Sequence, residues 1–430
     1  MDRILDSDRL AQVGRELRQE LASSNAHELA GDWVRRAARV MAEQMLSAEV
    51  DEALGRDSYQ RRDDEGPAGY RNGYKRRAIR TAEGKVAVDV PQVRGRGDDE
   101  GPYRSALWQA LGKRRSPALE KLAVEMYARG LSTRDIEDLL KELSDEQDQQ
   151  SLLSKSAVSR VTEVLWDEFE AFAKRDLSGF DVVYLFCDAV YESLRQQAGC
   201  RTAILVTWAV CSDGSKVLLH LSLGSKESSD AWLAHLRSVV SRNLPVPLTV
   251  TTDGAPGLIR AVEAMWPESE RVRCWFHKMQ NVLEKVPDAM REPIKRLLQD
   301  VRDAPDHETG TKRARALIER YERELPGATA CLAEDLEATL AHLKLPSLHQ
   351  KMIRTTNLCE RSFVEERRRS KVIPHFFDER SCLKLVFATL WRASQRWRGV
   401  RFTEMEKKQL AAYIRVRQAM GKKVRDLQAA

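Results

Sequence analysis

The sequence predicts an α/β core that contains an all-α insertion and is preceded by a mainly α-helical region. Three observations predict this class. Short apolar runs, typical of buried strands, begin near residue 181 and alternate with helical patterns. Residues 278–350 keep a helical pattern almost throughout, and most of residues 1–55 and 113–175 also has helical spacing.

The chain of 430 residues is long enough for two or three domains, each with its own core. The expected segments are a helical region (1–55), a basic Gly/Pro-rich arm (56–112), a helix-turn-helix-like domain (113–175), the first part of the core (176–277), the all-α insertion (278–350), the second part of the core (351–400), and a C-terminal helix and tail (401–430).

Composition favours a polyanionic partner and a reducing compartment. The 71 Lys and Arg residues exceed the 65 Asp and Glu residues by six, and the bases cluster, although a solvated charged surface is the competing interpretation. The seven cysteines form no CxxC pair, which is typical of a reduced, cytosolic protein. No apolar stretch has bilayer length and the N-terminus has no signal-peptide pattern, so we expect a cytoplasmic protein without a membrane partner.

The first 112 residues are expected to form a helix and then an arm. A helical pattern through GDWVRRAARVMAEQMLSAEVDEAL ends at Gly55. The following YRNGYKRRAIR is basic, with two interleaved tyrosines, and KVAVDV alternates as a short strand would. A basic arm of this kind fits phosphate contacts, although solvated loops look similar. The candidate phosphate-binding residues are Arg71, Lys75, Arg76 and Arg77.

Residues 113–175 predict three helices. The first two are joined by a Gly-Leu-Ser turn, and Ser132 or Thr133 is the expected cap of the second. The third is expected to run from about Ser154 to residue 175, with Lys155 and Arg160 as candidate DNA contacts. This pattern resembles a helix-turn-helix unit, and plain three-helix packing is an equally good interpretation.

From residue 181 the pattern predicts strands and helices in the order β-β-β-α-β-α-β. The first strand is closed by Asp188, a hairpin turns through Ser212–Ser215, and the fourth strand runs out at Asp253. A last short strand is expected through Cys274 and His277. This order is that of an RNase H-like fold, in which the first and fourth strands are neighbours, so Asp188 and Asp253 should lie side by side.

A third acid follows the insertion. A helix beginning near Thr356 or Asn357 carries Glu360 and continues until a break at Pro374. Two aspartates and a glutamate are hard oxygen ligands suited to Mg²⁺ or Mn²⁺, and two such ions can promote an in-line phosphodiester displacement. Alternatively, Asp253 shapes a turn and Glu360 closes a capping box begun by Asn357.

The same helix is strongly basic after Glu360. Its cations fit a grip on the phosphates of a cleaved strand, and the alternative is a solvated face balanced by Glu365 and Glu366. These cations are Arg361, Arg367, Arg368, Arg369 and Lys371.

Several blocks resemble the mutator-type DDE transposases of bacterial insertion sequences. They are DAVYESLR, TTDGAPGLIRAVEAMWP, RCWFHKMQNV and RTTNLCERSFVEERRRSKVIPHFFDERSCLKLVFATL, preceded by GYRNGY, PQVRGRG and ARGLSTRDIEDLL. The resemblance runs from about residue 30 to 400 and implies that Asp188, Asp253 and Glu360 are the catalytic triad and the metal ligands, with Mg²⁺ as cofactor and Mn²⁺ able to substitute.

By this resemblance the protein is a nucleoid-associated bacterial DNA transposase. It would bind the terminal inverted repeats of its insertion sequence, cleave DNA and transfer the strands to target DNA, as a homodimer or higher homo-oligomer. The Cys274-x-x-His277 block with Trp275 is expected beside the acids in a structural or DNA-contacting role, not as a metal site. The alternatives are a catalytically silent DNA-binding relative and, less well supported, a general RNase H-like nuclease.

Overall fold

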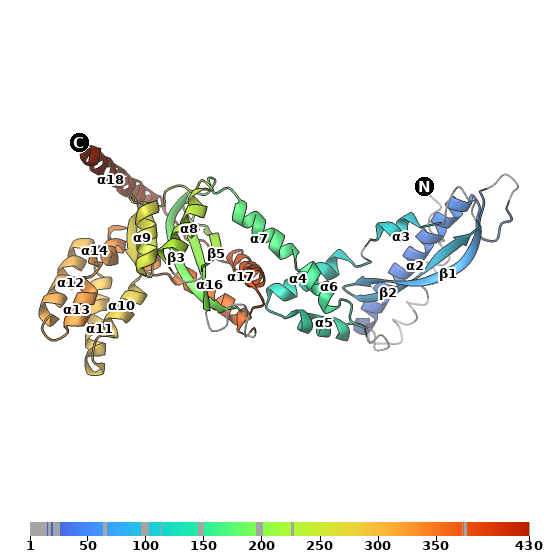
Figure 1. Ribbon diagram of the computed structural model, residues 1–430, viewed down its shortest axis with the longest axis horizontal. Coiled ribbons are helices and arrows are strands. Elements are labelled where there is room, and N and C mark those ends of the chain that lie inside the picture. The colour runs from blue at the N-terminus through green and yellow to red at the C-terminus, as the bar shows by residue number, and fades with distance from the viewer. Residues whose placement is uncertain are drawn as a thin grey trace. The chain divides into compact units, whose positions relative to one another are not determined.

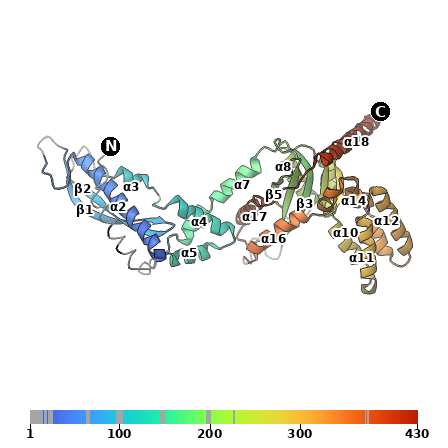
Figure 2. The same cartoon turned by 180° about the vertical axis from the view of Figure 1, so that it is seen from behind.

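The computed structural model describes residues 15, 19, 26–62, 67–95, 103–112, 114–144, 150–194, 201–224, 228–371, 373 and 376–429. The chain divides into two compact units, Met1–Glu163 and Val164–Ala430 (Figures 1 and 2). The division falls inside the expected segment 113–175. Pro374, where a helix break was expected, lies outside the described residues.

Among its described residues, the first unit contains a long helix and a β-hairpin. Helix α2 (Ala26–Leu54) ends as expected at Gly55, whose φ of +62° is the left-handed conformation that glycine adopts most easily. Strands β1 (Tyr70–Thr81) and β2 (Gly84–Arg94) then pair antiparallel around a tight turn (Figure 1). The expected flexible arm is therefore wrong for residues 70–81, which form β1 with a register shift between Arg71 and Tyr74, whereas the short strand expected at KVAVDV is confirmed by β2.

The hairpin forms because only one of its faces is apolar. Val86, Val88 and Val90 alternate along β2 and are buried against Leu46 of α2 and Trp108 of α3 (Ala106–Ala110). The opposite strand β1 keeps its cations at exposed or half-buried positions. The apolar residues at every second position of β2 indicate a strand in the sequence. Strand β1 has no such pattern and can be recognised only because it pairs with β2.

Three helices complete the first unit. They are α4 (Pro117–Ala128), α5 (Thr133–Glu142) and α6 (Lys155–Val161). Ser132 caps α5 through a capping box with Asp135, which confirms the expected start of that helix. The expected third helix to residue 175 is wrong, because the chain breaks at Thr162 and Glu163 and restarts as α7 (Val164–Lys174) in the second unit.

The break separates two apolar surfaces that belong to different cores. Ala157 and Val158 of α6 are buried in the helix cluster of the first unit. Phe169 and Phe172 of α7 pack on Phe387 of helix α17 (Glu379–Ser394), with ring centroids 5.6 and 4.9 Å apart. A single straight helix could not present both surfaces to their partners.

The second unit is built on a five-stranded sheet of order β5-β4-β3-β6-β7. Its strands are β3 (Val182–Ser193), β4 (Arg201–Cys211), β5 (Lys216–Gly224), β6 (Thr249–Thr252) and β7 (Glu270–Arg273). Strands β3, β4 and β5 are antiparallel, whereas β6 is parallel to both β3 and β7. The expected element order, the hairpin through Ser212–Ser215 and the adjacency of the first and fourth strands are all confirmed.

The alternation of β3 and β4 gives the sheet two different faces. Leu185 and Leu205 face helices α8 (Ser229–Val240) and α9 (Pro256–Met265) in one apolar cluster. On the other face, the Tyr184 hydroxyl lies 2.7 Å from His349 Nδ1, and Trp208 stacks on Trp397 at 4.6 Å. Helix α16 (Asn357–Ser370) contacts β3 and β4.

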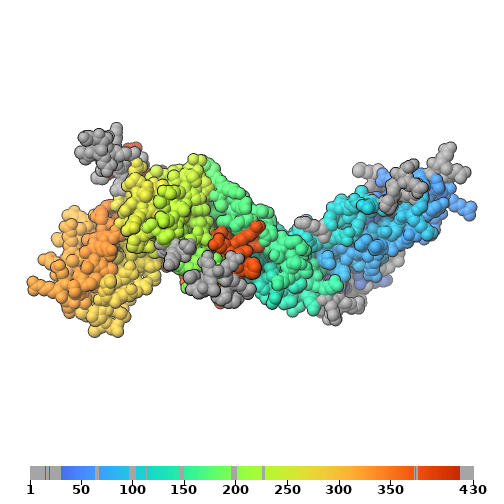
Figure 3. All heavy atoms as spheres, viewed as in Figure 1, coloured from blue at the N-terminus to red at the C-terminus, as the bar shows by residue number. Residues whose placement is uncertain are grey.

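The all-α insertion separates β7 from α16. Its helices are α10 (Trp275–Leu283), α11 (Asp288–Arg302), α12 (His307–Tyr321), α13 (Pro326–Ala333), α14 (Leu336–Leu340), a 3₁₀ turn (Ala341–Lys344) and α15 (Ser347–Ile353). They share an apolar core around Leu298, Leu317 and Leu332, and in the space-filling view, yellow to orange, they form one compact body (Figure 3). The insertion begins at Trp275, three residues earlier than expected.

The C-terminal part of the chain is helical, as expected. Helix α18 (Glu404–Ala429) follows α17. Among the described residues, no helix combines the length and the apolar character that crossing a bilayer requires.

Candidate active site

Asp188 and Asp253 lie where the parallel pairing of β3 and β6 ends. The last paired residues are Cys187 on β3 and Thr252 on β6, and each aspartate is the next residue along its strand. The expectation that Asp188 closes its strand is wrong, because β3 continues to Ser193 and Asp188 pairs with Val206 of β4. The two carboxylates nevertheless meet at one edge of the parallel ladder.

Burial and the neighbouring aspartate change the acidity of Asp188. The residue is only 8% exposed, and its Oδ1 accepts a hydrogen bond from the Ala189 N–H at 2.8 Å. Loss of solvation, followed by the charge of Asp253, raises the pKa of Asp188 to about 7, against the opposing effect of His277. A carboxylate in this state needs a nearby cation to stay ionised at neutral pH.

Asp253 is positioned by the turn that follows it. Its Oδ1 accepts a hydrogen bond from the Ala255 N–H at 2.9 Å, and Gly254 between them has a φ of +88°. A Cβ at Gly254 would lie only 0.9 Å from Nη1 of Arg273, so the buried guanidinium occupies the space that a side chain would need. The Asp-Gly pair signals the turn in the sequence, whereas nothing in the sequence signals the role of Arg273.

Glu360 reaches the site from α16. Side chains alternate along β3, so Asp188 lies on the same face of the sheet as Tyr184. That face carries the C-terminal segments of the chain, and α16 contacts β3. The N-cap of α16 is Thr356, and the Thr356 hydroxyl donates to Glu360 Oε1 at 3.4 Å. The alternative capping box between Asn357 and Glu360 is therefore wrong, since Glu360 lies four residues after the N-cap.

Cys274 and His277 connect the aspartates with Glu360. Potential ligand atoms of Cys274, His277 and Glu360 all lie within 4.8 Å of one another. The backbone N–H of Thr356 donates to Cys274 Sγ at 3.4 Å, and the single hydroxyl hydrogen of Thr356 can be directed either to Cys274 Sγ at 3.6 Å or to Glu360 Oε1. A hydrogen bond with Cys274, together with the charges of Asp188 and Asp253, raises the pKa of His277 to about 9 in spite of its burial.

The expected strand position of this Cys-x-x-His block is wrong. Strand β7 ends at Arg273, Cys274 is the N-cap of α10, and His277 lies in the first turn of that helix. Trp275 is 1% exposed and belongs to the core of the insertion, so it anchors α10 while His277 faces the acids.

The acids have the character of a site for hard divalent cations. No lysine or arginine among the described residues forms an ion pair with Asp188, Asp253 or Glu360, and burial, followed by the charge of Asp253, raises the pKa of Asp188 although His277 opposes the shift. Among the described residues, one potential ligand atom from each of Cys274, His277 and Glu360 lies within 4.8 Å of the others. The three carboxylates of Asp188, Asp253 and Glu360 do not form such a set. Oxygen donors with this excess of negative charge fit Mg²⁺ or Mn²⁺. A closed zinc site needs four protein ligands, and among the described residues only Cys274, His277 and Glu360 come together in this way.

The cations of α16 are partly neutralised. Glu365 pairs with both Arg368 and Arg369 at 2.7 Å. Arg361 and Arg367 are exposed, and the charge of Arg361 contributes, after burial, to a lowered pKa of Lys216 on β5. Lys216 is therefore a neighbouring cation that sequence reasoning missed, because it belongs to a different element.

The candidate phosphate-binding cations of the first unit also differ in how far their side chains are exposed or already paired. Arg71 pairs with Asp51 and donates to the Arg56 carbonyl at 3.0 Å, so it ties β1 to α2. Lys75, Arg76, Lys155 and Arg160 are exposed, and Arg77 is half-buried.

Similarity to known proteins shows the family of this chain. Residues 12–399 match the family described as "Transposase, Mutator family", and the chain belongs to that family. It is 30% identical over 367 residues to a transposase for insertion sequence element ISRM5 from Rhizobium meliloti (strain 1021), covering 85% of this chain and 89% of that relative. It is 29% identical over 399 residues to a transposase for insertion sequence element IS1081 from Mycobacterium tuberculosis (strain ATCC 25618 / H37Rv), covering 90% and 91%. The protein is thus a transposase of mobile insertion sequences.

Proposed function

We propose that the chain is a DDE transposase whose catalytic acids are Asp188, Asp253 and Glu360, on an RNase H-like core. The observation that carries this proposal is the meeting of Asp188 and Asp253 at the end of one parallel ladder, with Glu360 delivered to the same face by α16. The sheet order and the all-α insertion between β7 and α16 support the fold assignment.

Asp188, Asp253 and Glu360 would hold divalent ions, Mg²⁺ or Mn²⁺. When bound, such ions activate a water or a DNA 3′-hydroxyl and stabilise the leaving oxygen of a phosphodiester. The substrates would be the terminal inverted repeats of the element and a target DNA, and the working form a homo-oligomer on DNA. The family and the named relatives support DNA as the substrate.

The residues around the acids have supporting roles in this proposal. The His277 imidazolium offsets the repulsion between the acids until cations are bound. The Gly254 turn with Arg273 fixes the backbone after Asp253, and Thr356 joins Glu360 to Cys274. Residues of four elements therefore keep the carboxylates in place before DNA arrives.

Strand cleavage of labelled element-end DNA in Mn²⁺ tests the proposal. Asp188→Asn, Asp253→Asn and Glu360→Gln should each abolish cleavage and strand joining while DNA binding remains nearly intact, because affinity comes mainly from cationic contacts. Glu319→Gln, an exposed acid on α12, is the matched control and should cleave normally. Normal cleavage by Glu360→Gln would overturn the triad. Binding without cleavage by the unaltered protein would favour the silent DNA-binding relative.

A further inference from the structure

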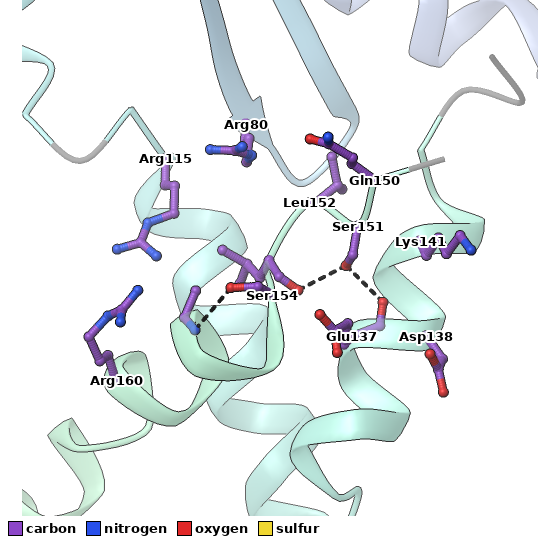
Figure 4. A pocket seen from close by; sticks show the side chains of 12 residues that line it. Arg80, Arg115, Glu137, Asp138, Lys141, Gln150, Ser151, Leu152, Ser154 and Arg160 are labelled. Atoms are coloured by element: carbon purple, nitrogen blue, oxygen red, sulfur yellow. Dashed lines mark hydrogen bonds between the residues drawn. The ribbon is translucent and has the colours of Figure 1, made fainter. Parts of the chain in front are cut away.

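The first unit contains a pocket of about 710 Å³ that the proposed catalytic site does not use (Figure 4). It lies among the end of β1, Arg115, helices α5 and α6, and residues 150–154. Leu152 and Leu153 contribute apolar surface, and the Ser151 hydroxyl lies 2.7 Å from the Glu137 carbonyl oxygen and 2.8 Å from that of Leu153, which share its one hydrogen and hold residues 151–153 against α5. The pocket is therefore held in shape by backbone contacts.

Two arginines are placed side by side in this pocket by the backbone. The Arg80 N–H donates to the Arg114 carbonyl at 2.9 Å, the Ser116 N–H donates to the Arg80 carbonyl at 2.8 Å, and Arg80 and Arg115 form a parallel bridge. Arg114 adopts a left-handed φ of +56°, which is uncommon for a residue other than glycine and is found where a fold imposes a local geometry. Ser116 then caps α4, so the hairpin and the helices are joined at this point.

The arginines in the pocket have little compensation. Figure 4 shows Arg80, Arg115 and Arg160 on one side, and Glu137 and Asp138 with Lys141 on the other. Arg115 pairs with Glu120 at 3.3 Å, but its side chain is only 13% exposed and its Nε has no hydrogen-bond partner in the described structure. The side chains of Arg80 and Arg160 form no ion pair or hydrogen bond with described residues. A phosphate oxygen would give Arg80 and Arg160 the anionic partner that their side chains lack among the described residues.

We infer that this pocket binds the phosphodiester backbone of DNA, with phosphate oxygens held by Arg80, Arg115 and Arg160. Guanidinium groups are planar forks that match phosphate oxygens, and three of them from β1, the 114–116 segment and α6 converge here. Glu137 and Asp138 repel phosphate on the far side, so the backbone runs along the arginine side. The inference deepens the proposed function, on which it rests, by naming where the first unit holds the DNA.

The test measures binding of the full-length protein to a fluorescent DNA duplex over a series of salt concentrations. Arg80→Gln combined with Arg160→Gln breaks no ion pair, and it should weaken binding about tenfold and reduce the salt dependence by about one to two phosphate contacts. Lys121→Gln combined with Arg134→Gln removes the same charge from exposed positions of α4 and α5 outside the pocket, and it should have a clearly smaller effect.

The outcomes separate this inference from the proposed function. If the unaltered protein binds no DNA, the proposed function fails. If it binds DNA but the Arg80/Arg160 variant keeps its affinity and salt dependence, or the control loses as much, the pocket is not a backbone site. In a titration with inorganic phosphate, the unaltered protein should show no phosphate binding that is lost in the Arg80/Arg160 variant. Such binding, with DNA affinity unchanged, would identify a small-anion site and overturn the inference.

Discussion

At the residue scale, the acid site is balanced by an internal cation. His277 lies in the first turn of α10, and its raised pKa keeps it protonated at neutral pH beside Asp188 and Asp253. The environment of Asp188 disfavours its charged form, because burial and the charge of Asp253 favour the neutral carboxylic acid. The folded protein without bound cations therefore carries an electrostatic cost at this site that a divalent ion would relieve.

The first prediction is that Asp188→Asn stabilises the metal-free protein at neutral pH. The pKa of Asp188 rises from 3.8 in the unfolded chain to about 7 in the folded one, so the folded state holds the proton more tightly. Stability contributed by this proton is complete below pH 3.8 and is lost as pH rises to 7. Removing the carboxylate should raise the free energy of unfolding at pH 8 by roughly 1–3 kcal/mol. Thermal denaturation in a chelator, from pH 5 to 8.5, measures it.

His277 gives the same experiment an internal comparison. Its pKa rises from 6.5 to about 9, so its contribution is complete below pH 6.5 and is lost as pH rises towards 9. His277→Gln should therefore destabilise the metal-free protein below pH 7, opposite in sign to Asp188→Asn. Added Mg²⁺ should stabilise the unaltered protein more than Asp188→Asn. A variant Asp188→Asn that is less stable than the unaltered protein at pH 8 would contradict the electrostatic account.

The second prediction concerns Gly254. Gly254→Ala adds a Cβ that would overlap the Arg273 guanidinium at a φ of +88°, so both steric overlap and backbone strain act. We expect a cost of about 2–4 kcal/mol and a displaced Asp253, hence loss of cleavage. Gly73→Ala is the matched control: its φ is +70° but nothing lies within 4 Å, so only about 1 kcal/mol of backbone strain is expected. Equal melting temperatures for the two variants would show that Arg273 moves aside freely.

At the element scale, α16 combines an acid for the site with cations along its exposed side. Glu360 lies at its beginning, while Arg367 and Arg368 lie in its last turn. Glu365 pairs with Arg368 and Arg369, which supports part of the alternative interpretation as a solvated face. Arg361 beside Lys216 extends positive charge onto β5.

The third prediction is that Arg367→Ala combined with Arg368→Ala slows cleavage more than it weakens DNA binding. If these cations hold the phosphates of the cleaved strand, single-turnover cleavage should fall about tenfold or more. The melting temperature should change little, because exposed ion pairs contribute at most about 1 kcal/mol. The exposed pair Arg296→Ala and Arg315→Ala in the insertion is the control of equal charge. An unchanged cleavage rate would leave these arginines as solvated surface.

The sequence predicted the elements whose pattern is local. The apolar runs and the Asp-Gly pair predicted the β4–β5 hairpin. The order of the elements predicted that β3 and β6 are neighbours in the sheet. Strand β1 was missed because a basic strand has no apolar period of its own. His277 was assigned to the wrong element, because ERVRCWFHK does not show where a strand of four residues ends. Asp253 and Glu360 were chosen from their order along the chain and from the family resemblance, and their catalytic role stays a prediction, whereas the contacts of Arg273 depend on tertiary packing.

At the scale of the whole molecule, the chain divides into two compact units at the boundary between Glu163 and Val164. The helix cluster and hairpin form one unit, and the acids with their supporting residues form the other. Helix α7 belongs with the acids, since Phe169 and Phe172 are buried against α17. Sequence reasoning placed this helix with the first unit because its helical pattern follows that of α6 after only two residues.

The last prediction separates these two assignments of α7. A fragment of residues 1–163 keeps the whole core of the first unit, so it should be monomeric and bind DNA with an affinity that falls steeply as salt rises. A fragment of residues 1–175 carries Leu165, Phe169 and Phe172 without the surface that buries them, so it should self-associate and bind an apolar dye. Light scattering after size-exclusion chromatography and dye fluorescence compare the two fragments. Their DNA affinities should agree, because the added segment contributes one face of apolar residues and a net charge near zero. If residues 1–175 stay monomeric while residues 1–163 unfold, α7 belongs to the DNA-binding unit, and the boundary lies at the position that the sequence suggested.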